Sequence, residues 1–298
     1  MKLAVHIMLN SGARQFNEEI SEKIAISFAR YPQVSCRLHS CDPSSIGTEI
    51  SKAVKSSADI ICAAGGDGTV SLVVNYLIDN QLPLGIVPLG TLNHLAKDLG
   101  IPLDLDKSVD VVCSGRTAEI DVGEVNGNHF INNVSIGVYP KIVQLRDRLQ
   151  SYIGKWPAMV LASVVVLAKI ALFHVQVEWD DHVIRRIVPV LFIGNNAYET
   201  SWPDTGSRKS LNKGILWLLV IRSKGGWAKL RAIILSLAGK SDEGQEIEIF
   251  ETAGLTIRAF RRTMTIGIDG ETLKIRSPLN FRCHPAALKV RVPADFVQ

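Results

Sequence analysis

A glycine-rich turn with a single acid is the segment of this chain best suited to chemistry. Gly65-Gly66-Asp67-Gly68-Thr69 follows the apolar run 58–64 and precedes the apolar-periodic segment 70–78, a pattern typical of strand, tight loop and helix start. Glycines let backbone approach a ligand closely, and a helix N-terminus attracts phosphate. Asp67 would repel a bare phosphate, so we expect it to hold a cation that the phosphate shares. The same letters also make good turn sequence.

A second polar loop follows the next apolar run, residues 84–87. Pro88-Leu89-Gly90-Thr91-Leu92-Asn93 leads into a helix that we expect to end near residue 99, because Gly100 occupies the C′ position and Pro102 follows. Two consecutive strand–loop–helix units place both loops at the carboxyl edge of a parallel sheet. Open α/β sheets bind their ligands at that edge.

Predicted strands and predicted helices alternate along the first part of the chain, and these elements must position the two loops. This alternation predicts a doubly wound α/β fold with helices on both faces of a parallel sheet. The expected strands cover residues 2–9, 34–39, 58–64 and 84–87, and the expected helices cover residues 16–29, 44–55, 70–78, 94–99 and 104–113.

After residue 116 strands dominate, which predicts a β-rich, sandwich-like second domain. Asn126-Gly127 between residues 120–125 and 129–134 indicates a hairpin with a type I′ turn. Helices are expected at residues 139–173 and 227–237. Further strands are expected at residues 175–179, 183–193, 215–221, 247–251, 255–260, 264–268, 272–275 and 287–292.

The composition of the chain indicates which partners and which cellular compartment to expect. The chain has 298 residues, 47% of them apolar, and a net charge of +4 without a long basic block, which does not favour nucleic acid as a partner. Five cysteines without CxxC spacing, and no signal peptide, predict a reduced, cytoplasmic protein. The apolar stretch 156–173 is interrupted by Lys169 and is too short for a membrane span. We interpret it as a buried helix, with an acyl-chain pocket or a membrane-surface helix as the alternative.

These motifs together resemble the catalytic domain of the diacylglycerol kinase family, which includes bacterial lipid kinases and the sphingosine kinases. The glycine loop is shared with NAD kinases and phosphofructokinases, whereas the Pro-Leu-Gly-Thr-x-Asn segment is more specific. The remaining similar segments occur in the family's order: Asn10-Ser11-Gly12, without the usual following proline, Ile120-Asp121-Val122-Gly123, Asn132-Asn133-Val134-Ser135-Ile136-Gly137 and Asp269-Gly270-Glu271.

The resemblance implies two domains with the active site in the cleft between them. Residues 1–118, with about 282–298, would form an α/β nucleotide-binding domain of the NAD kinase and diacylglycerol kinase type. Residues 119–281 would form the lipid-substrate domain. ATP would be the donor, Mg²⁺ the cofactor and a lipid hydroxyl the acceptor.

The resemblance also assigns roles to single residues. Asp67 would act on magnesium, and Asp269 would be the general base for the acceptor hydroxyl. The nucleotide would contact Asn10, Gly65, Gly66, Gly68, Thr69, Gly90, Thr91, Asn93 and Glu271. Simpler readings stay open: Asn10, Thr91 and Asn93 are good capping residues, and residues 268–272 make a good hairpin turn.

Two departures from the family pattern matter. Asn212-Lys213-Gly214 stands where relatives often carry acids that bind a second, structural magnesium, so we expect that site to be absent or altered. His94 stands where relatives often carry an acid, and we interpret it as a solvated helix residue. Asp121 is expected to be structural at the domain junction.

The leading hypothesis is an ATP-dependent lipid kinase, cytoplasmic and peripheral to the membrane, whose lipid substrate lies at the membrane surface. It would have no transmembrane span and no nucleic-acid partner, and a homodimer is left open. The alternatives are a kinase of a soluble acceptor such as NAD, and an inactive nucleotide-binding regulator. Retention of Asp67, Asp269 and Glu271 argues against the inactive regulator.

Overall fold

The computed structural model describes residues 2–11, 18–78, 80–137, 172–199, 206–221, 247–259 and 262–297. The chain divides into two compact units, Met1–Val122 with Pro285–Gln298, and Gly123–His284. We call them unit 1 and unit 2. Two strands, β5 (Arg116–Val125) and β16 (Leu279–Val292), contain the points at which the chain passes from one unit to the other.

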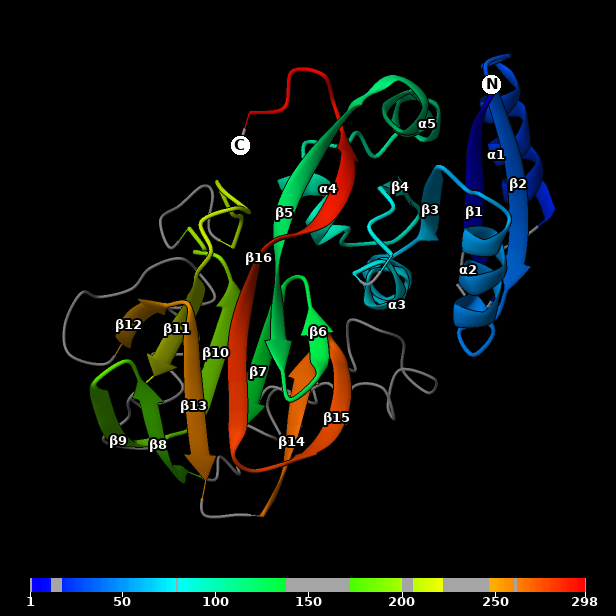
Figure 1. Cartoon of the computed structure of the whole chain (residues 1–298). Helices are drawn as coiled ribbons and strands as arrows, with labels where there is room; N and C mark the ends of the chain where they lie inside the picture. The colour runs from blue at the N-terminus through cyan, green and yellow to red at the C-terminus, as the bar shows by residue number, and fades with distance from the viewer. Residues whose placement is uncertain are drawn as a thin grey trace. The chain divides into compact units, whose positions relative to one another are not determined.

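Unit 1 is built on a parallel sheet in the order β2-β1-β3-β4 (Figure 1). The last part of β16 runs parallel to β4, with Val290 opposite Leu84. Because β1 lies between β2 and β3, the chain order reverses beside β1, and the carboxyl ends of β1 and β3 flank this switch point. The strands are β1 (Leu3–Asn10), β2 (Val34–Cys41), β3 (Ile60–Gly65) and β4 (Leu84–Pro88).

Helices cover both faces of this sheet. Successive strand residues point to opposite faces, and in β1 Val5 and Ile7 share a buried cluster with Phe28 of α1 and Val112 of α5. The other face of β1 meets α2 and its C-cap, where Ser56 contacts His6, and α2 contacts α3. The helices are α1 (Glu18–Ala29), α2 (Ile46–Lys55), α3 (Asp67–Leu77), α4 (His94–Asp98) and α5 (Leu105–Ser114).

Unit 2 consists of a separate antiparallel sheet and the antiparallel part of the mixed sheet, and these two layers share one core. One follows the order β12-β11-β10-β7-β14-β15, and the other includes β16, β13, β8 and β9, with the β5–β6 hairpin beside β16. Leu191 and Leu218 of the first sheet and Ile257 and Phe281 of the second belong to the same buried cluster. The remaining strands are β6 (Asn128–Phe130), β7 (Asn133–Gly137), β8 (Phe173–Trp179), β9 (His182–Val188), β10 (Val190–Asn195), β11 (Leu216–Ile221), β12 (Ile247–Thr252), β13 (Gly254–Ala259), β14 (Thr263–Ile268) and β15 (Glu271–Arg276).

The coarse fold prediction is confirmed: a mixed sheet with helices and a separate antiparallel sheet. The expected strand 129–134 is wrong, because the chain turns at residues 131–132 and β7 joins the other sheet. The expected strand 183–193 breaks at Pro189, which cannot donate a ladder hydrogen bond. β16 is longer than predicted, and Phe173, expected to end a helix, begins β8. The rest of the expected helix 139–173, up to residue 171, and the whole expected helix 227–237 lie outside the described residues.

Candidate functional site

The carboxyl ends of β1 and β3 bring the first group of predicted residues together. Asn10, the last residue of β1, donates from Nδ2 to Oγ1 of Thr69 at 3.1 Å. Thr69 lies in the first turn of α3 and is buried. The contact spans the switch point of the sheet, where the strand order leaves room for a ligand above the strand ends.

The two glycine loops touch each other through their backbones. A Cβ atom added to Gly90 would lie 2.5 Å from Cα of Gly66 and 2.6 Å from Oδ1 of Asn93. A Cβ on Gly65 would lie 2.5 Å from Oγ1 of Thr69. Real Cβ atoms do not approach other atoms so closely, so Gly65 and Gly90 are required by packing. The loops after β3 and β4 therefore form one structure.

Asp67 joins the two loops by hydrogen bonds. Its Oδ2 accepts the backbone N–H of Asn93 at 2.8 Å, and its Oδ1 accepts that of His94 at 2.7 Å. These N–H groups open α4, whose N-cap residue Asn93 makes no side-chain cap of its own. A carboxylate suits a helix N-terminus because it satisfies donors that lack an intrahelical partner and complements the helix dipole.

Asn93 instead fixes the turn before it. Its Oδ1 accepts the N–H of Gly90 at 3.0 Å, its Nδ2 donates to the Gly90 carbonyl at 2.8 Å, and its backbone has a φ of +51°. Asparagine tolerates this left-handed conformation better than most residues. Gly68 follows Asp67 in the first turn of α3, whereas Thr91 and His94 are exposed in the second loop and at the start of α4.

The carboxylate of Asp67 is compatible with a bound Mg²⁺. Each of its oxygens accepts one N–H, and an ionised carboxylate offers about four lone-pair positions. Mg²⁺ in phosphoryl-transfer sites is held by one or two carboxylates together with phosphate oxygens and water. The two amide contacts also fix the orientation of the carboxylate before any ion binds.

Asp269 lies in the hairpin turn between β14 and β15. Asp269 and Gly270 have φ values of +46° and +91°, which are typical of a type I′ turn. The Asp269 carboxylate accepts three consecutive backbone N–H groups, those of Ile131 and Asn132 between β6 and β7 and that of Asn133 at the start of β7, at 2.9, 2.8 and 3.1 Å. Asp269 therefore fixes these three residues as well as forming the turn.

A buried arginine also holds the segment between β6 and β7. Arg208 is 4% exposed and donates to the carbonyls of Ile131 and Asn195 at 2.6 and 3.0 Å, and to Oδ1 of Asn132 at 2.9 Å. Its guanidinium lies 5.4 Å from the ring centre of Tyr198. Arg208 could not be predicted from the sequence, because an arginine in a polar stretch carries no local signal of burial.

The remaining residues singled out in the sequence make few contacts that bear on the site. Glu271 begins β15 and is exposed. Asp121 is buried and accepts the N–H of Ala286 at 2.9 Å. Asn212 and Lys213 are exposed, and Lys213 donates its backbone N–H to Oδ1 of Asn196. Asp67 belongs to unit 1 and Asp269 to unit 2, so their meeting across a groove stays a prediction.

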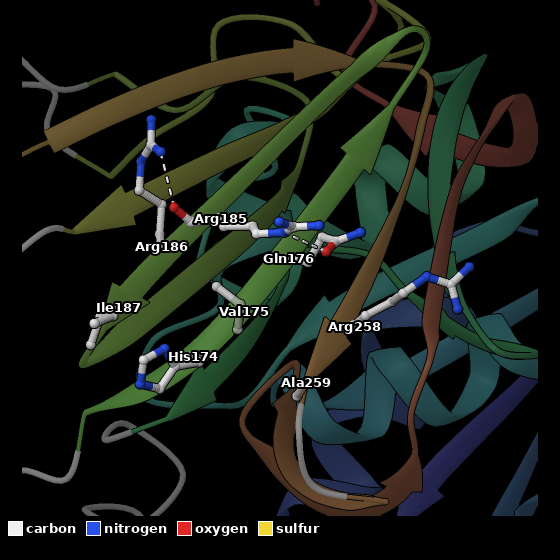
Figure 2. Close-up of a pocket in the computed structure, with 8 residues that line it drawn as sticks. All are labelled: His174, Val175, Gln176, Arg185, Arg186, Ile187, Arg258 and Ala259. Carbon is white, nitrogen blue, oxygen red and sulfur yellow. Dashed lines mark hydrogen bonds between the residues drawn. The ribbon is translucent and has the colours of Figure 1, made fainter.

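A basic pocket of about 520 Å³ lies on unit 2, over β8, β9 and β13. Figure 2 shows Arg185 and Gln176 joined across β9 and β8, with a 2.9 Å bond from Nε to Oε1, and Arg258 projecting from β13. Arg258 pairs with Glu178 and Arg186 with Glu248, whereas Arg185 donates to a neutral amide. His174 and the 47% exposed Ile187 complete a rim that is both cationic and apolar.

Comparison with known proteins agrees with these features. The family model for the diacylglycerol kinase catalytic domain matches residues 4–125. A diacylglycerol kinase of Bacillus subtilis is 31% identical over 221 residues, which cover 72% of this chain and 71% of the relative. One from Staphylococcus aureus (strain MRSA252) is 26% identical over 309 residues, covering all of this chain and 95% of the relative.

Solved structures share the fold along nearly the whole chain. A candidate diacylglycerol kinase from Bacillus anthracis superposes with a TM-score of 0.78 at 20% identity, covering 99% of both chains. A second structure from that organism, described as a diacylglycerol kinase, gives a TM-score of 0.69 at 18% identity. No helix among the described residues is long and apolar enough to span a bilayer.

Proposed function

The chain belongs to the diacylglycerol kinase family and is a kinase, and we propose that it transfers the γ-phosphoryl group of ATP to the hydroxyl of a lipid. The single observation that best supports this proposal is the link from Asp67 to the second loop at the switch point of unit 1. Phosphoryl transfer depends on positioning and on stabilising charge, and this link holds a carboxylate between two glycine loops.

On the donor side, we assign the loops after β3 and β4 to the triphosphate. Gly65, Gly66 and Gly90 leave no side chain between the backbone and the phosphates. Thr69 and Asn10, already joined to each other, would fix the floor of this site. Gly68, Thr91, Asn93 and Glu271 complete the proposed nucleotide contacts.

Asp67 is the proposed holder of Mg²⁺. The ion, when bound, would neutralise charge on the phosphate oxygens. The contribution of this chain is to keep the carboxylate in place, because the amides of Asn93 and His94 restrain both of its oxygens. The expectation that Asn212 and Lys213 leave a second magnesium site absent or altered stays a prediction.

On the acceptor side, Asp269 is the proposed general base. As the bond from the γ-phosphorus to the bridging oxygen of ADP breaks, a new bond forms to the lipid hydroxyl oxygen, whose proton passes to Asp269. Three backbone amides orient this carboxylate. The buried Arg208 would act as a positioning residue, since it holds the segment that carries two of those amides, Ile131 and Asn132.

We place the lipid acceptor at a membrane surface. The rim formed by Arg185, Arg258 and Ile187 supports this assignment, because cationic side chains beside exposed apolar ones favour an anionic bilayer surface. Arg185→Glu should weaken sedimentation with phosphatidylglycerol vesicles, whereas Lys55→Glu, on α2 of unit 1 and with the same change of charge, should not. Equal binding by both variants would contradict this placement.

The acceptor is tested by supplying γ-labelled ATP with a total lipid extract and, separately, with NAD. The proposal predicts label in the organic phase and none in NADP. Label in NADP alone would favour the soluble-acceptor kinase. Label in neither product, with ATP bound, would favour an inactive nucleotide-binding protein.

A further inference from the structure

Two histidines and one glutamate converge on unit 2, on and beside the β5–β6 hairpin. Glu124 of β5, His129 of β6 and His284 of β16 have ligand atoms that all lie within 4.8 Å of one another. Oε2 of Glu124 is 2.6 Å from Nε2 of His284, and the two histidine rings meet edge to face with centroids 5.9 Å apart. Among the residues that the structure describes, this is the single such group of three or more potential metal ligands.

The backbone holds these side chains side by side. Glu124 and His129 are directly opposite each other in the β5–β6 ladder, so they share one face of the hairpin. β5 also pairs with β16, which supplies His284. Beneath the hairpin, the rings of Phe130 and Phe281 pack edge to face, with centroids 6.4 Å apart.

The hairpin is also tied to β16 beyond the cluster. Asn126, which lies in the turn of the hairpin, accepts the N–H of Asn280 at 2.7 Å and donates to the Pro278 carbonyl at 2.9 Å. The second carboxylate oxygen of Glu124 accepts the N–H of Gly127 at 2.8 Å. Such a contact orients a ligating carboxylate, and a bound ion would replace the proton that Oε2 shares with Nε2 of His284.

The donor set selects the class of ion. Two imidazoles and one carboxylate suit a first-row transition ion, Zn²⁺ above all, whereas Mg²⁺ and Ca²⁺ prefer oxygen ligands. All three residues are half-buried, so an ion can enter without unfolding and can complete its coordination with water. Burial opposes ionisation of Glu124, but the hydrogen bonds from His284 and Gly127 and the charges of both histidines together outweigh it, so the pKa of this carboxyl lies below its usual value.

We propose that Glu124, His129 and His284 form a binding site for Zn²⁺ or a similar divalent transition ion, built from residues other than those assigned to phosphoryl transfer. The site has a defined place in the chain. Glu124 lies two residues beyond the boundary at Val122, and His284 is the last residue before unit 1 resumes at Pro285. A bound ion therefore links β5 to β16 close to the two points where the chain passes between the units.

The test uses the full-length protein, stripped with EDTA and dialysed, then titrated with Zn²⁺ by calorimetry. Wild type should bind with an affinity at least tenfold higher than that of His129→Gln or His284→Gln, since each variant removes one of three ligands. His182→Gln removes an exposed histidine on β9, outside the cluster, and this variant should bind as wild type does. Circular dichroism confirms that each variant is folded.

Two further readouts keep the result independent of catalysis. Zn²⁺ should raise the melting temperature of the wild type and not that of the His129→Gln/His284→Gln double variant. Co²⁺ should give visible absorption bands with the wild type that the double variant lacks. The proposal is overturned if wild type takes up no more metal than the double variant, or if His182→Gln loses binding as His284→Gln does.

Discussion

The backbone N–H of Asn93 donates to Oδ2 of Asp67 at 2.8 Å, across 26 residues of chain. This bond makes the two glycine loops of unit 1 one structure. Asp67 thus contributes to the start of α4 as well as to the proposed metal site, and its removal should have two separable consequences.

Replacing Asp67 by Asn should reduce the Mg²⁺·ATP-dependent rate by about 100-fold or more, because the charge at the phosphates is lost. Asparagine can accept only one of the two amides, so the free energy of unfolding should also fall by about 1–3 kcal/mol. Enzyme assays and urea denaturation measure the two effects.

Asp59→Asn is the matched control. Asp59 precedes β3 at the opposite edge of the sheet and also accepts a backbone N–H, that of Ala4 at 2.7 Å. Its replacement should cost some stability and leave the rate of folded enzyme unchanged. Equal losses of rate in the two variants would contradict a specific role for Asp67.

Gly90→Ala should separate the two loops. The new Cβ would lie 2.5 Å from Cα of Gly66, a backbone atom that cannot rotate away. We expect ATP affinity, measured by calorimetry, to fall at least tenfold. Gly100→Ala provides the comparison. The φ of +66° at Gly100 gives strain of about 1 kcal/mol in the alanine variant, while the new Cβ would come no closer than 4.0 Å to its nearest neighbour, Cδ2 of Phe296. ATP affinity in Gly100→Ala should be preserved, and a similar loss in both variants would refute the packing argument.

The stability of the protein should fall as pH drops below about 6.5 because of His6. Burial lowers the pKa of His6 below 6.5, and the charges of His39 and Arg37 add to this effect. Glu49 pairs with His39 rather than with His6. Between the two pKa values, the unfolded chain binds a proton at His6 and the folded chain does not, so the free energy of unfolding falls as the pH drops. This fall ends once the pH lies below the pKa of His6 in the folded state.

Urea denaturation at pH 7.5 and 5.5 measures this effect. His6→Gln should show a smaller fall in the midpoint between the two pH values than wild type does. His182→Gln, an exposed histidine on β9, should behave as wild type. An unchanged pH dependence in His6→Gln would show that His6 titrates normally.

Cysteine reactivity should follow burial. All five cysteines are free thiols, and Cys36 is exposed whereas Cys41, Cys62 and Cys113 are buried. Burial raises the pKa of Cys41 to about 11 and that of Cys113 to about 12, and it raises the pKa of Cys62 further. Because the thiolate is the reactive form, a thiol reagent at neutral pH should modify Cys36 first. The fast phase should disappear in Cys36→Ser, and its persistence would contradict the structure.

Local sequence patterns predicted the parts of the fold that depend on local chemistry. The glycine loops, the left-handed Gly100 and the Asn126-Gly127 turn follow from residue type, and φ is +66° at Gly100, +46° at Asn126 and +82° at Gly127. Pro189 was a visible signal for the break between β9 and β10, but the alternation of apolar residues around it masked that signal.

Tertiary contacts explain what the sequence could not show. The turn at residues 131–132 is fixed by Asp269, more than 130 residues later in the chain, so no local pattern reveals it. Arg208 likewise becomes a buried donor only when β7 and β10 come together. The convergence of Glu124, His129 and His284 depends on β16 returning beside β5.

The most direct test of the account compares Asp269→Asn with Asp180→Asn in ADP release from Mg²⁺·ATP and diacylglycerol micelles. Asp180 has a φ of +47° in the β8–β9 hairpin turn and thus resembles Asp269 in backbone conformation. We predict a loss of ~100-fold or more for Asp269→Asn at temperatures where it is folded, with ATP binding retained and Asp180→Asn fully active. Full lipid-dependent activity in Asp269→Asn would contradict the proposed transfer mechanism.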